Sequence, residues 1–351
     1  MVGSNTLAAL TLALSLWPAA VSVEHPPVES QWDVPQWDDL SFLITCDDST
    51  FRRAVGPLAN ATFLSYVSTR GSYYNPRYDN ATVPGWARSF ELYQDPVNGG
   101  MRALLFLKTD TATGNPSQAI VAFRGTDLGD SEPSHLADSC ADQMLWERIP
   151  YSELPDNCRN AFNESTLDYA SSALTFVEEV QAKYDGIRVM LTGHSLGAGL
   201  ATVVAARFNQ AASSVEEKGI VRALSFAAPP VAQVLGPAVS LDHSKFAVLA
   251  DPYDPVFVES VCPQQQTSGA MLCVFSSGEE PSSCRRCYEK FPVNSSKPEC
   301  GECFSERHIY KHYYDDLVPG PRAECTKTSK DVPSPWSARC FGGEHGDVNH
   351  A

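Results

Sequence analysis

A serine flanked by glycines is the first candidate for chemistry in this chain of 351 residues. Residues 193–197 read Gly-His-Ser-Leu-Gly and fit the pattern G-x-S-x-G around Ser195. The preceding residues 187–191 predict a strand, and the alanine-rich residues 196–212 predict a helix. A serine on such a strand-to-helix turn is typical of a nucleophile elbow, where crowded backbone leaves no room for flanking side chains. A plain tight turn is the alternative, but it gives no reason for a serine at the apex.

Two aspartates are candidates for the acid that a serine nucleophile requires. Such a serine needs a histidine to remove its proton and a carboxylate to orient that histidine. In the chain order Ser–Asp–His, the acid follows a later strand. Asp251 and Asp254 both come directly after the apolar residues 244–250, which predict a strand. Each precedes a proline, and Asp-Pro pairs also form simple turns, so the residues alone leave both acids open.

Two histidines near the end of the chain are candidates for the base. His308 and His312 both lie within residues 303–317, downstream of both acids. We favour His308, because the apolar pair Ile309 and Tyr310 follows it and can hold its loop. His312 begins an aromatic run that packing alone explains, and it remains the alternative.

Two backbone groups are candidates for stabilising the oxyanion that forms during acyl transfer. One is the N–H of Leu196, which follows Ser195 at the start of the predicted helix. The other is the N–H of Thr126, in a loop that follows an earlier apolar stretch; its hydroxyl can also hold that loop. An ordinary turn accounts equally well for the neighbouring Arg124 and Gly125. This chemistry requires no metal or organic cofactor.

Strand and helix patterns alternate through the middle of the chain. Residues 118–127 form a nearly continuous apolar run, as expected of a central strand buried on both faces. Residues 166–183 predict a helix with Ser165 as its N-cap. Further strands are predicted at 89–95, 101–109, 187–191, 221–230 and 244–250, and a further helix at 62–71. Alternation of this kind predicts an α/β fold with a mostly parallel central sheet.

The alternation breaks at both ends and at one insertion. Residues 23–61 predict a proline-rich, irregular arm, and residues 319–351 an irregular tail. Between them, residues 62–318 predict a single domain. Within it, residues 261–303 lose the pattern and predict a cysteine-rich insertion.

Composition and leader predict a protein of the secretory pathway. The formal net charge of −16 argues against nucleic acids and anionic membrane surfaces as main partners. An apolar run from Leu7 to Trp17, followed by small residues, predicts a signal peptide over residues 1–22. A retained membrane anchor is the alternative, but the run is short and Pro18 interrupts it. Four N-x-S/T sequons fit export: Asn60, Asn80, Asn163 and Asn294.

The eleven cysteines also fit an exported protein. Two CxxC pairs, Cys284/Cys287 and Cys300/Cys303, have the spacing of a four-cysteine zinc site. In an oxidising compartment thiols pair before metal binds, so we favour disulfides and keep zinc as the alternative. Because the total is odd, one thiol is free or pairs between chains. The remaining cysteines are expected to add further bridges: Cys46, Cys140, Cys158, Cys262, Cys273, Cys325 and Cys340.

With these residues located, the chain resembles the class 3, fungal-type lipases of the α/β-hydrolase fold. The resemblance is carried, in the family's order, by VAFRGTD, VMLTGHSLGAGLATVVAARF, ALSFAAPPV and LADPYDPVF. In such lipases the acid heads a D-x-V-P-like stretch, which implies Asp254 rather than Asp251. Two features depart from the family. Ala161 stands where a glycine is usual, and neither His308 nor His312 is followed three residues on by tyrosine.

The resemblance implies a secreted serine carboxylester hydrolase that acts on acylglycerols at an oil–water interface, without inserting stably into a membrane. A phospholipase A1 or a feruloyl-type esterase is an alternative on the same fold. A catalytically silent lipase-like binding protein is the alternative from another class. The resemblance also implies a lid over residues 127–150, which are amphipathic in their second half. A surface loop tied down by Cys140 is the alternative to that lid.

Overall fold

The computed structural model describes residues 37–97, 99–129, 133–211, 221–229, 231–236, 239, 241–257, 270–275, 278–290 and 300–326. In these residues, strands follow one another across a single sheet in chain order, and neighbours from β3 to β7 are parallel. The outer pairs β1–β2, β2–β3 and β7–β8 are antiparallel. The strands are β1 (Ala87–Arg88), β2 (Ala103–Thr109), β3 (Pro116–Phe123), β4 (Arg188–Gly193), β5 (Val221–Phe226), β6 (Phe246–Ala250), β7 (Met271–Val274) and β8 (Glu324–Thr326).

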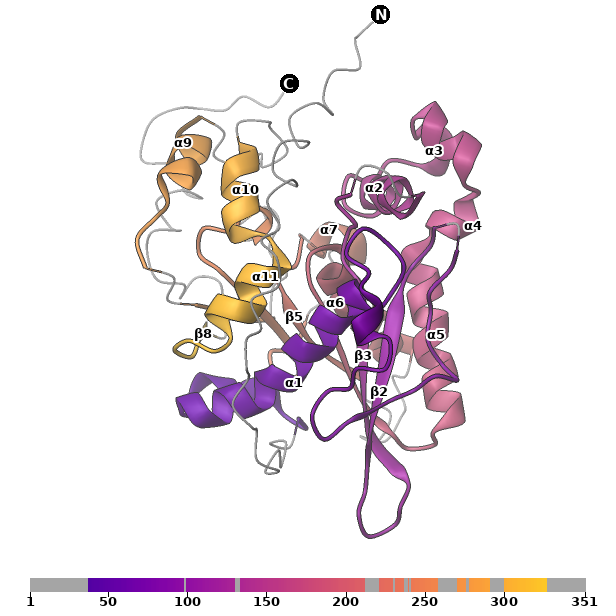
Figure 1. Cartoon of the computed structure of the whole chain (residues 1–351), viewed down its shortest axis with the longest axis vertical. Coiled ribbons are helices and arrows are strands. Elements are labelled where there is room, and N and C mark those ends of the chain that lie inside the picture. Colours follow the sequence, from indigo (N-terminus) through magenta and orange to yellow (C-terminus); the bar gives the residue numbers. More distant parts are fainter. Residues whose placement is uncertain are drawn as a thin grey trace, which may run out of the picture.

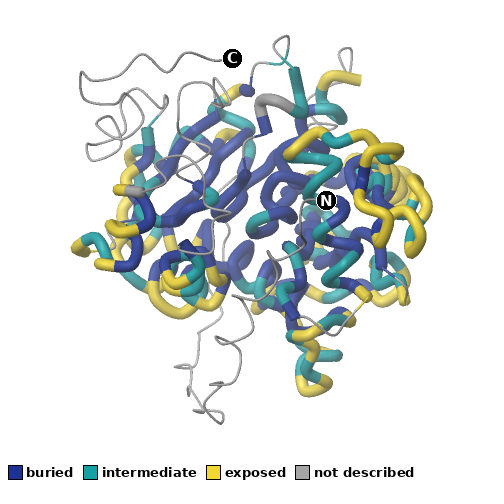
Figure 2. The backbone as a smooth tube through the Cα atoms, turned by 90° about the horizontal axis from the view of Figure 1, so that it is seen from above, coloured by how far each residue is buried: buried dark blue, intermediate teal, exposed yellow. Residues whose placement is uncertain are grey.

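Helices cover both faces of the sheet, so the core has two layers. Helix α1 (Asp48–Val67) packs on one face, and α5 (Tyr169–Lys183) and α6 (Leu196–Ala211) pack on the other. Side chains of β2 alternate between the layers: Leu104 faces α1, and Leu105 faces α5 and α6. Figure 2 shows the strands and the inner sides of the helices as the buried part of the molecule. Burial on both faces explains the continuous apolar runs.

The N-terminal helix begins earlier than the sequence pattern predicts. Helix α1 starts at Asp48, where the side chain of Asp47 accepts the N–H of Thr50 as an N-cap. Residues 48–61 therefore belong to a core helix instead of an irregular arm. Pro57 lies buried inside this helix. Because proline is disfavoured in the interior of a helix, its presence argues against a helix when only the sequence is considered.

The predicted helix at 166–183 is two helices. A short α4 (Glu164–Leu167) is capped by Asn163, and α5 is capped by Asp168, whose side chain accepts the N–H of Ser171. Ser165 is thus not the N-cap of the long helix. The predicted strand at 89–95 is also absent. In that stretch the N–H of Ser89 donates to the carbonyl of Leu105, and Gln94 forms a single bridge to Ala103.

The cysteine-rich segment contributes to the sheet as well as to a helical hairpin. Strand β7 lies inside the predicted insertion, and β8 lies inside the predicted tail; the disulfide Cys273–Cys325 joins them. Beyond β7, helices α9 (Ser282–Lys290) and α10 (Gly301–Arg307) are joined by Cys284–Cys303 and Cys287–Cys300. The predicted disulfides are confirmed at both CxxC pairs, which leaves no thiolates there for zinc.

The remaining described elements lie mainly at the carboxyl edge of the sheet, where Figure 1 shows α2 to α4 on one side and α9 to α11 on the other. They are α2 (Pro133–Leu145), α3 (Asp156–Ala161), α7 (Ala232–Leu235), α11 (Tyr310–His312), a π-helical turn (Tyr313–Leu317), and short 3₁₀ turns at Leu40–Ile44, Pro76–Tyr78 and Tyr151–Glu153. A fourth disulfide, Cys140–Cys158, joins α2 to α3, and Cys46 is free among the described cysteines.

The prediction of an α/β-hydrolase fold with a mostly parallel sheet and a disulfide-stabilised cysteine-rich segment is confirmed. None of the described helices combines the length and the apolar character needed to cross a bilayer. The predicted signal peptide, Asn294, Cys262 and Cys340 lie outside the described residues.

Candidate active site

Ser195 occupies a strained turn between β4 and α6. Its φ of +56° lies in the left-handed region, which costs free energy for any residue with a side chain. A Cβ on Gly193 would approach the backbone of Gly197 to 2.4 Å, and a Cβ on Gly197 would approach the carbonyl oxygen of Phe123 to 2.3 Å. The N–H of Ser195 donates to the carbonyl of Phe226 on the neighbouring strand, 3.1 Å away. Both glycines are therefore required by close backbone packing.

The structure brings Ser195, His308 and Asp254 into one chain of hydrogen bonds. Nε2 of His308 lies 2.8 Å from Oγ of Ser195, and Nδ1 lies 2.9 Å from each carboxylate oxygen of Asp254. Because Nδ1 faces a carboxylate, it carries the proton, and Nε2 is left to accept the serine hydroxyl. His308 is 2% exposed and Asp254 is fully buried, so solvent does not compete for these bonds.

Asp254 is held by several donors besides His308. Its carboxylate accepts the N–H of Val256 at 2.9 Å, the N–H of Phe257 at 3.3 Å and the hydroxyl of Tyr313 at 2.6 Å. Burial, reinforced by Asp254, raises the pKa of Tyr313 well above its usual value, so the phenol remains a donor. Sequence reasoning missed Tyr313, which is one member of an aromatic run. Nothing in its spacing marks it as the partner of Asp254.

The alternative acid and the alternative histidine form a pair of their own. Nε2 of His312 lies 2.7 Å from Oδ2 of Asp251, and Nδ1 lies 3.0 Å from Oδ2 of Asp316. Both ring nitrogens face carboxylates, so both carry protons and neither is free to accept one. Burial alone would lower the pKa of His312, but its hydrogen bonds to Asp251 and Asp316 raise it overall.

His194, inside the elbow, faces the α1 side of the site. Its Nδ1 lies 3.0 Å from the hydroxyl of Tyr66, and its ring centroid lies 4.7 Å from that of His308. Burial and the neighbouring His308 lower the pKa of His194 well below its usual value, so the ring is neutral. Ligand atoms of His194, Asp254 and His308 lie within 4.8 Å of one another. Both nitrogens of His308 are already in hydrogen bonds, which accounts for this cluster without a metal.

The two predicted oxyanion groups lie at the ends of neighbouring parallel strands. Leu196 is the first residue of α6, where N–H groups point out of the helix. Thr126 follows β3, and its hydroxyl donates to Oδ2 of Asp142, 2.7 Å away. Nε1 of Trp146 donates to the other oxygen of Asp142 at 3.0 Å. With the Thr126 hydroxyl turned to Asp142, the Thr126 N–H is the group available to an oxyanion.

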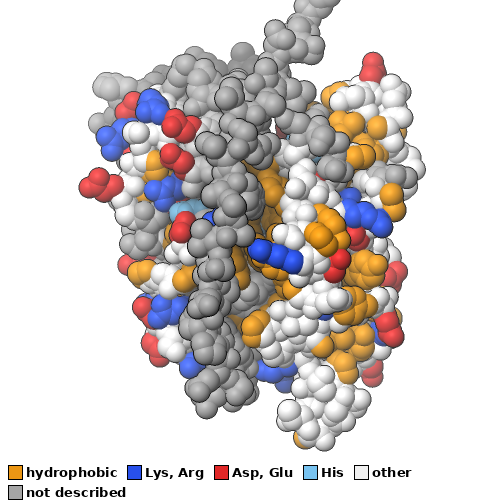
Figure 3. Space-filling view, viewed as in Figure 1, with side chains coloured by type: hydrophobic (Ala, Val, Ile, Leu, Met, Phe, Trp, Pro, Cys, Tyr) orange, Lys and Arg blue, Asp and Glu red, His pale blue; other side chains and the backbone are white. Residues whose placement is uncertain are grey.

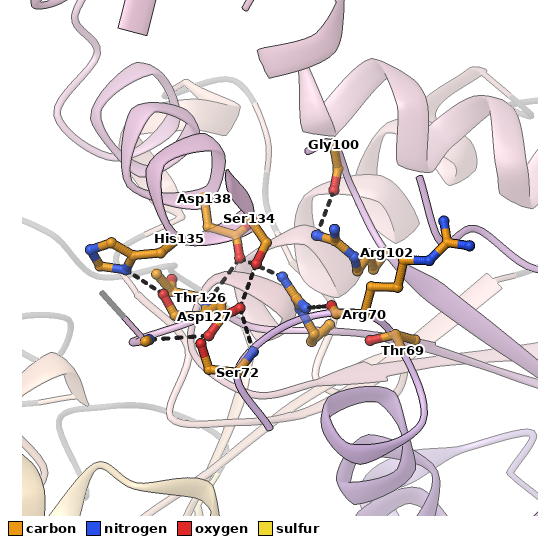
Figure 4. Close-up of polar contacts among 12 residues, drawn as sticks. Thr69, Arg70, Ser72, Gly100, Arg102, Thr126, Asp127, Ser134, His135 and Asp138 are labelled. Carbon is orange, nitrogen blue, oxygen red and sulfur yellow. Dashed lines mark hydrogen bonds and ion pairs between the residues drawn. The ribbon is translucent and has the colours of Figure 1, made fainter. Parts of the chain in front are cut away.

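A buried polar network locks α2 to the loop after β3 (Figure 4). The carboxylate of Asp138 accepts from Nη2 of Arg124 at 2.7 Å, from the N–H of Asp127 at 2.9 Å and from the hydroxyl of Tyr169 at 2.7 Å. Asp127 in turn accepts the hydroxyl of Ser134 on α2. All five residues are at most 4% exposed, and Asp127 is fully buried. Burial opposes the charge of Arg124, but Asp138 and Asp127 raise its pKa, so it stays charged.

Covalent and packing contacts add to this attachment of α2. The disulfide Cys140–Cys158 ties its middle to α3. At its end, the ring of Trp146 lies so close to α6 that a Cβ on Gly199 would approach it to 2.4 Å. Among the described residues of the predicted lid, these contacts favour the alternative, a tethered segment. The face in Figure 3 has many apolar side chains over the half that carries α2, and more charged ones over the α9–α10 half.

Comparison with known proteins reveals one family. The model of the family described as Lipase (class 3) matches residues 120–239, which contain the loop after β3, the elbow and α6. “Putative lipase ATG15” of Cryptococcus neoformans var. neoformans serotype D (strain B-3501A) is 25% identical over 205 residues, which cover 52% of this chain but only 37% of that protein.

Solved structures of fungal lipases also align with this chain. The lipase of Rhizopus microsporus var. chinensis aligns with a TM-score of 0.39 and 15% identity, covering 68% of this chain and 78% of that one. Lipase II of Rhizopus niveus aligns with a TM-score of 0.37 and 17% identity, covering 70% and 90%.

Proposed function

We propose that this chain, whose residues 120–239 match the model of the class 3 lipases, is a serine carboxylester hydrolase that cleaves acylglycerols. The observation that carries the proposal is the hydrogen-bonded series Ser195–His308–Asp254 at the elbow. We further propose that the enzyme is secreted. The disulfides support this, because such bonds persist in oxidising compartments.

The proposed reaction uses one histidine as base and then as acid. Oγ of Ser195 attacks the ester carbonyl while Nε2 of His308 takes its proton, and Asp254 stabilises the imidazolium. His308 then gives this proton to the departing alcohol, which leaves an acyl group on Ser195. A water molecule, deprotonated by His308, attacks the acyl group; the fatty acid is released and Ser195 recovers its proton.

The N–H groups of Leu196 and Thr126 are the proposed oxyanion donors. Each belongs to a backbone segment that is already fixed: Leu196 by the start of α6, and Thr126 by its hydroxyl bond to Asp142. Donors held in place before the reaction need no reorganisation when charge develops, and one such donor is worth about 10²–10³-fold in rate.

The first test compares hydrolysis of tributyrin by the wild type and by Ser195→Ala, measured as acid release at constant pH. We expect the variant to lose about 10⁴-fold or more of kcat. Ser195→Gly should be equally inactive but more stable than Ser195→Ala, by about 1 kcal/mol, because glycine adopts positive φ without strain. Ser171→Ala, an exposed serine on α5, is the matched control and should keep full activity.

Activity that survives in Ser195→Ala would refute the proposed nucleophile. If the folded wild type hydrolyses none of tributyrin, a phospholipid and a feruloyl ester, the proposed enzymatic activity is refuted. A catalytically silent binding protein is then favoured. Hydrolysis of only the phospholipid or only the feruloyl ester would keep the mechanism and replace the substrate. His308→Asn and His312→Asn separate the two histidines, since only the first should abolish kcat.

A further inference from the structure

His308 lies at a break between two helices, just beyond the last residue of the first one. Helix α10 ends at Arg307, and α11 begins at Tyr310 after Ile309, which is extended with ψ 130°. The imidazole must nevertheless lie between Ser195 and Asp254, because an error of 1 Å in such a position costs about 10²-fold in rate. Contacts on both sides of the break can therefore affect the position of the ring.

A second buried carboxylate supplies contacts on both sides of this break. Oδ2 of Asp251 accepts from Nη1 of Arg307 at 3.2 Å and from Nε2 of His312 at 2.7 Å. Arg307 immediately precedes His308, and His312 follows it by four residues, across the break. Asp251 is fully buried, whereas the side chains of Arg307 and His312 are 16% and 13% exposed. Little solvent reaches these ion pairs, so screening weakens them little.

Asp251 is itself fixed to the acid of the proposed triad. It lies three residues before Asp254 at the end of β6, and its Oδ1 accepts the N–H of Tyr253 at 2.6 Å. Its own N–H donates to the hydroxyl oxygen of Tyr313 at 2.9 Å, and that hydroxyl donates to Asp254. Any shift of Asp251 is therefore transmitted to Asp254 as well as to the segment around His308.

We propose that Asp251 is a positioning residue for His308, holding its imidazole between Ser195 and Asp254 by binding Arg307 on one side and His312 on the other. This inference rests on the proposed function, in which His308 is the base. The Asp251 clamp, made of Asp251, Arg307 and His312, acts through the segment that carries His308 and takes no part in the proposed reaction steps. It thus gives the second acid and the second histidine of the sequence a role that is distinct from catalysis.

The charges around His312 support this role. Asp251 and Asp316 face its two nitrogens, Arg307 shares Asp251 with it, and the ring of Tyr313 lies beside it. The two carboxylates outweigh burial and Arg307, so the pKa of His312 is raised. The clamp therefore keeps its charge to a higher pH than an ordinary histidine would allow, and it weakens when the pH rises through the raised pKa.

The test measures kcat, KM and thermal stability for Asp251→Asn and His312→Gln. We expect Asp251→Asn to lower kcat by about 10–10²-fold with KM changed less than about threefold, because the base is misplaced while the substrate surface is intact. His312→Gln should lower kcat less and should lose the part of the alkaline pH dependence that follows titration of His312. Asp251→Glu should recover part of the lost kcat.

Two matched controls separate positioning from general destabilisation. The first control is Lys311→Gln. Lys311 lies on the same segment as His308 and His312, but it pairs with Asp315, which is outside the clamp. Asn209→Ala removes two hydrogen bonds to Val221 at the start of β5, the opposite end of that strand from the proposed site. Both should keep kcat, and Asn209→Ala should do so despite lower stability.

A folded Asp251→Asn variant with kcat within twofold of the wild type would overturn the inference. If Asp251→Asn does not fold, Arg307→Gln and His312→Gln decide in its place by the same split between kcat and KM. If folded wild type hydrolyses no ester, the proposed function fails, and the clamp is tested alone by NMR titration. A His312 pKa that is ordinary in the wild type, or unchanged in Asp251→Asn or Arg307→Gln, would then overturn it.

Discussion

The protonation of individual side chains separates residues that look equivalent in the sequence. His308 faces one carboxylate and one hydroxyl, so one of its nitrogens is free to accept a proton. His312 faces two carboxylates, so both of its nitrogens donate. A base must have an open lone pair, and by that criterion His308 is the candidate for catalysis and His312 for structure.

Asp142 leads to a prediction at the residue scale that depends on pH. Burial, opposed by the hydrogen bond from Thr126, raises the pKa of Asp142 to about 7. The unfolded chain ionises this group near pH 4, so the folded state binds the proton more tightly. The cost of ionising it in the folded state is absent below about pH 4, grows as the pH rises to about 7, and is constant above that.

We therefore expect Asp142→Asn to be more stable than the wild type at pH 8, by about 1–2 kcal/mol, and of similar stability near pH 4. Asp142 is partly exposed, so water offsets part of the cost of its charge, and the expected gain is smaller than the full pKa shift would give. Urea denaturation at both pH values measures the difference. Glu179→Gln, exposed on α5, is the control. Equal stability of Asp142→Asn and the wild type at pH 8 would contradict the assigned pKa.

At the scale of elements, the attachment of α2 has consequences for how substrate reaches Ser195. Asp138 ties α2 to the loop after β3, and Cys140–Cys158 ties it to α3. A lid that swings open would have to break the buried pair Arg124–Asp138, which is strongly unfavourable when it leaves a charge unpaired. The described part of α2 therefore forms a wall beside the proposed oxyanion groups.

We expect the wild-type rate on tributyrin to rise smoothly through the solubility limit. Because α2 is tied in place, no lid has to be displaced at an oil surface before the substrate binds. Assays across that limit measure this, and an increase of more than about fivefold at the onset of droplets would contradict the prediction.

Ser substitutions at both Cys140 and Cys158 should lower stability by about 2–4 kcal/mol and increase amide exchange in α2. The same pair of substitutions at Cys273 and Cys325 should leave exchange in α2 unchanged.

At the scale of the whole molecule, disulfides hold the edge of the sheet that carries the proposed base. Cys273–Cys325 joins β7 to β8, and the two bridges between α9 and α10 fix the helix that ends one residue before His308. The net charge of −16 opposes compaction through self-repulsion, which increases the value of covalent constraints.

Reduction should accordingly lower the thermal midpoint by at least about 10 °C and abolish activity under otherwise native conditions. Calorimetry with and without dithiothreitol measures the midpoint. A midpoint that does not change on reduction would show that packing alone holds this edge.

Without reductant, iodoacetamide should modify Cys46 alone among the described cysteines. The modification should be slow, because burial raises the pKa of the Cys46 thiol.

The sequence by itself determined the elements whose signal is local. The elbow around Ser195, the loop with Thr126 and the central strands could be predicted, because glycine spacing and continuous apolar runs reflect packing within a few residues. The start of α1 was missed because Pro57 interrupts its pattern. Strands β7 and β8 were missed because they are four and three residues long, too short for a periodicity to be recognised.

Only the tertiary structure decided which acid meets which histidine. Asp251 and Asp254 follow the same strand, and His308 and His312 lie four residues apart, so their positions alone allow either pairing. Only the apolar neighbours of His308 and the family resemblance favoured His308 with Asp254. The fold separates them through the break between α10 and α11, which directs His308 toward Ser195 and Asp254, and His312 toward Asp251. Contacts between residues more than fifty positions apart depend on how helices pack on the sheet, and no local pattern records that.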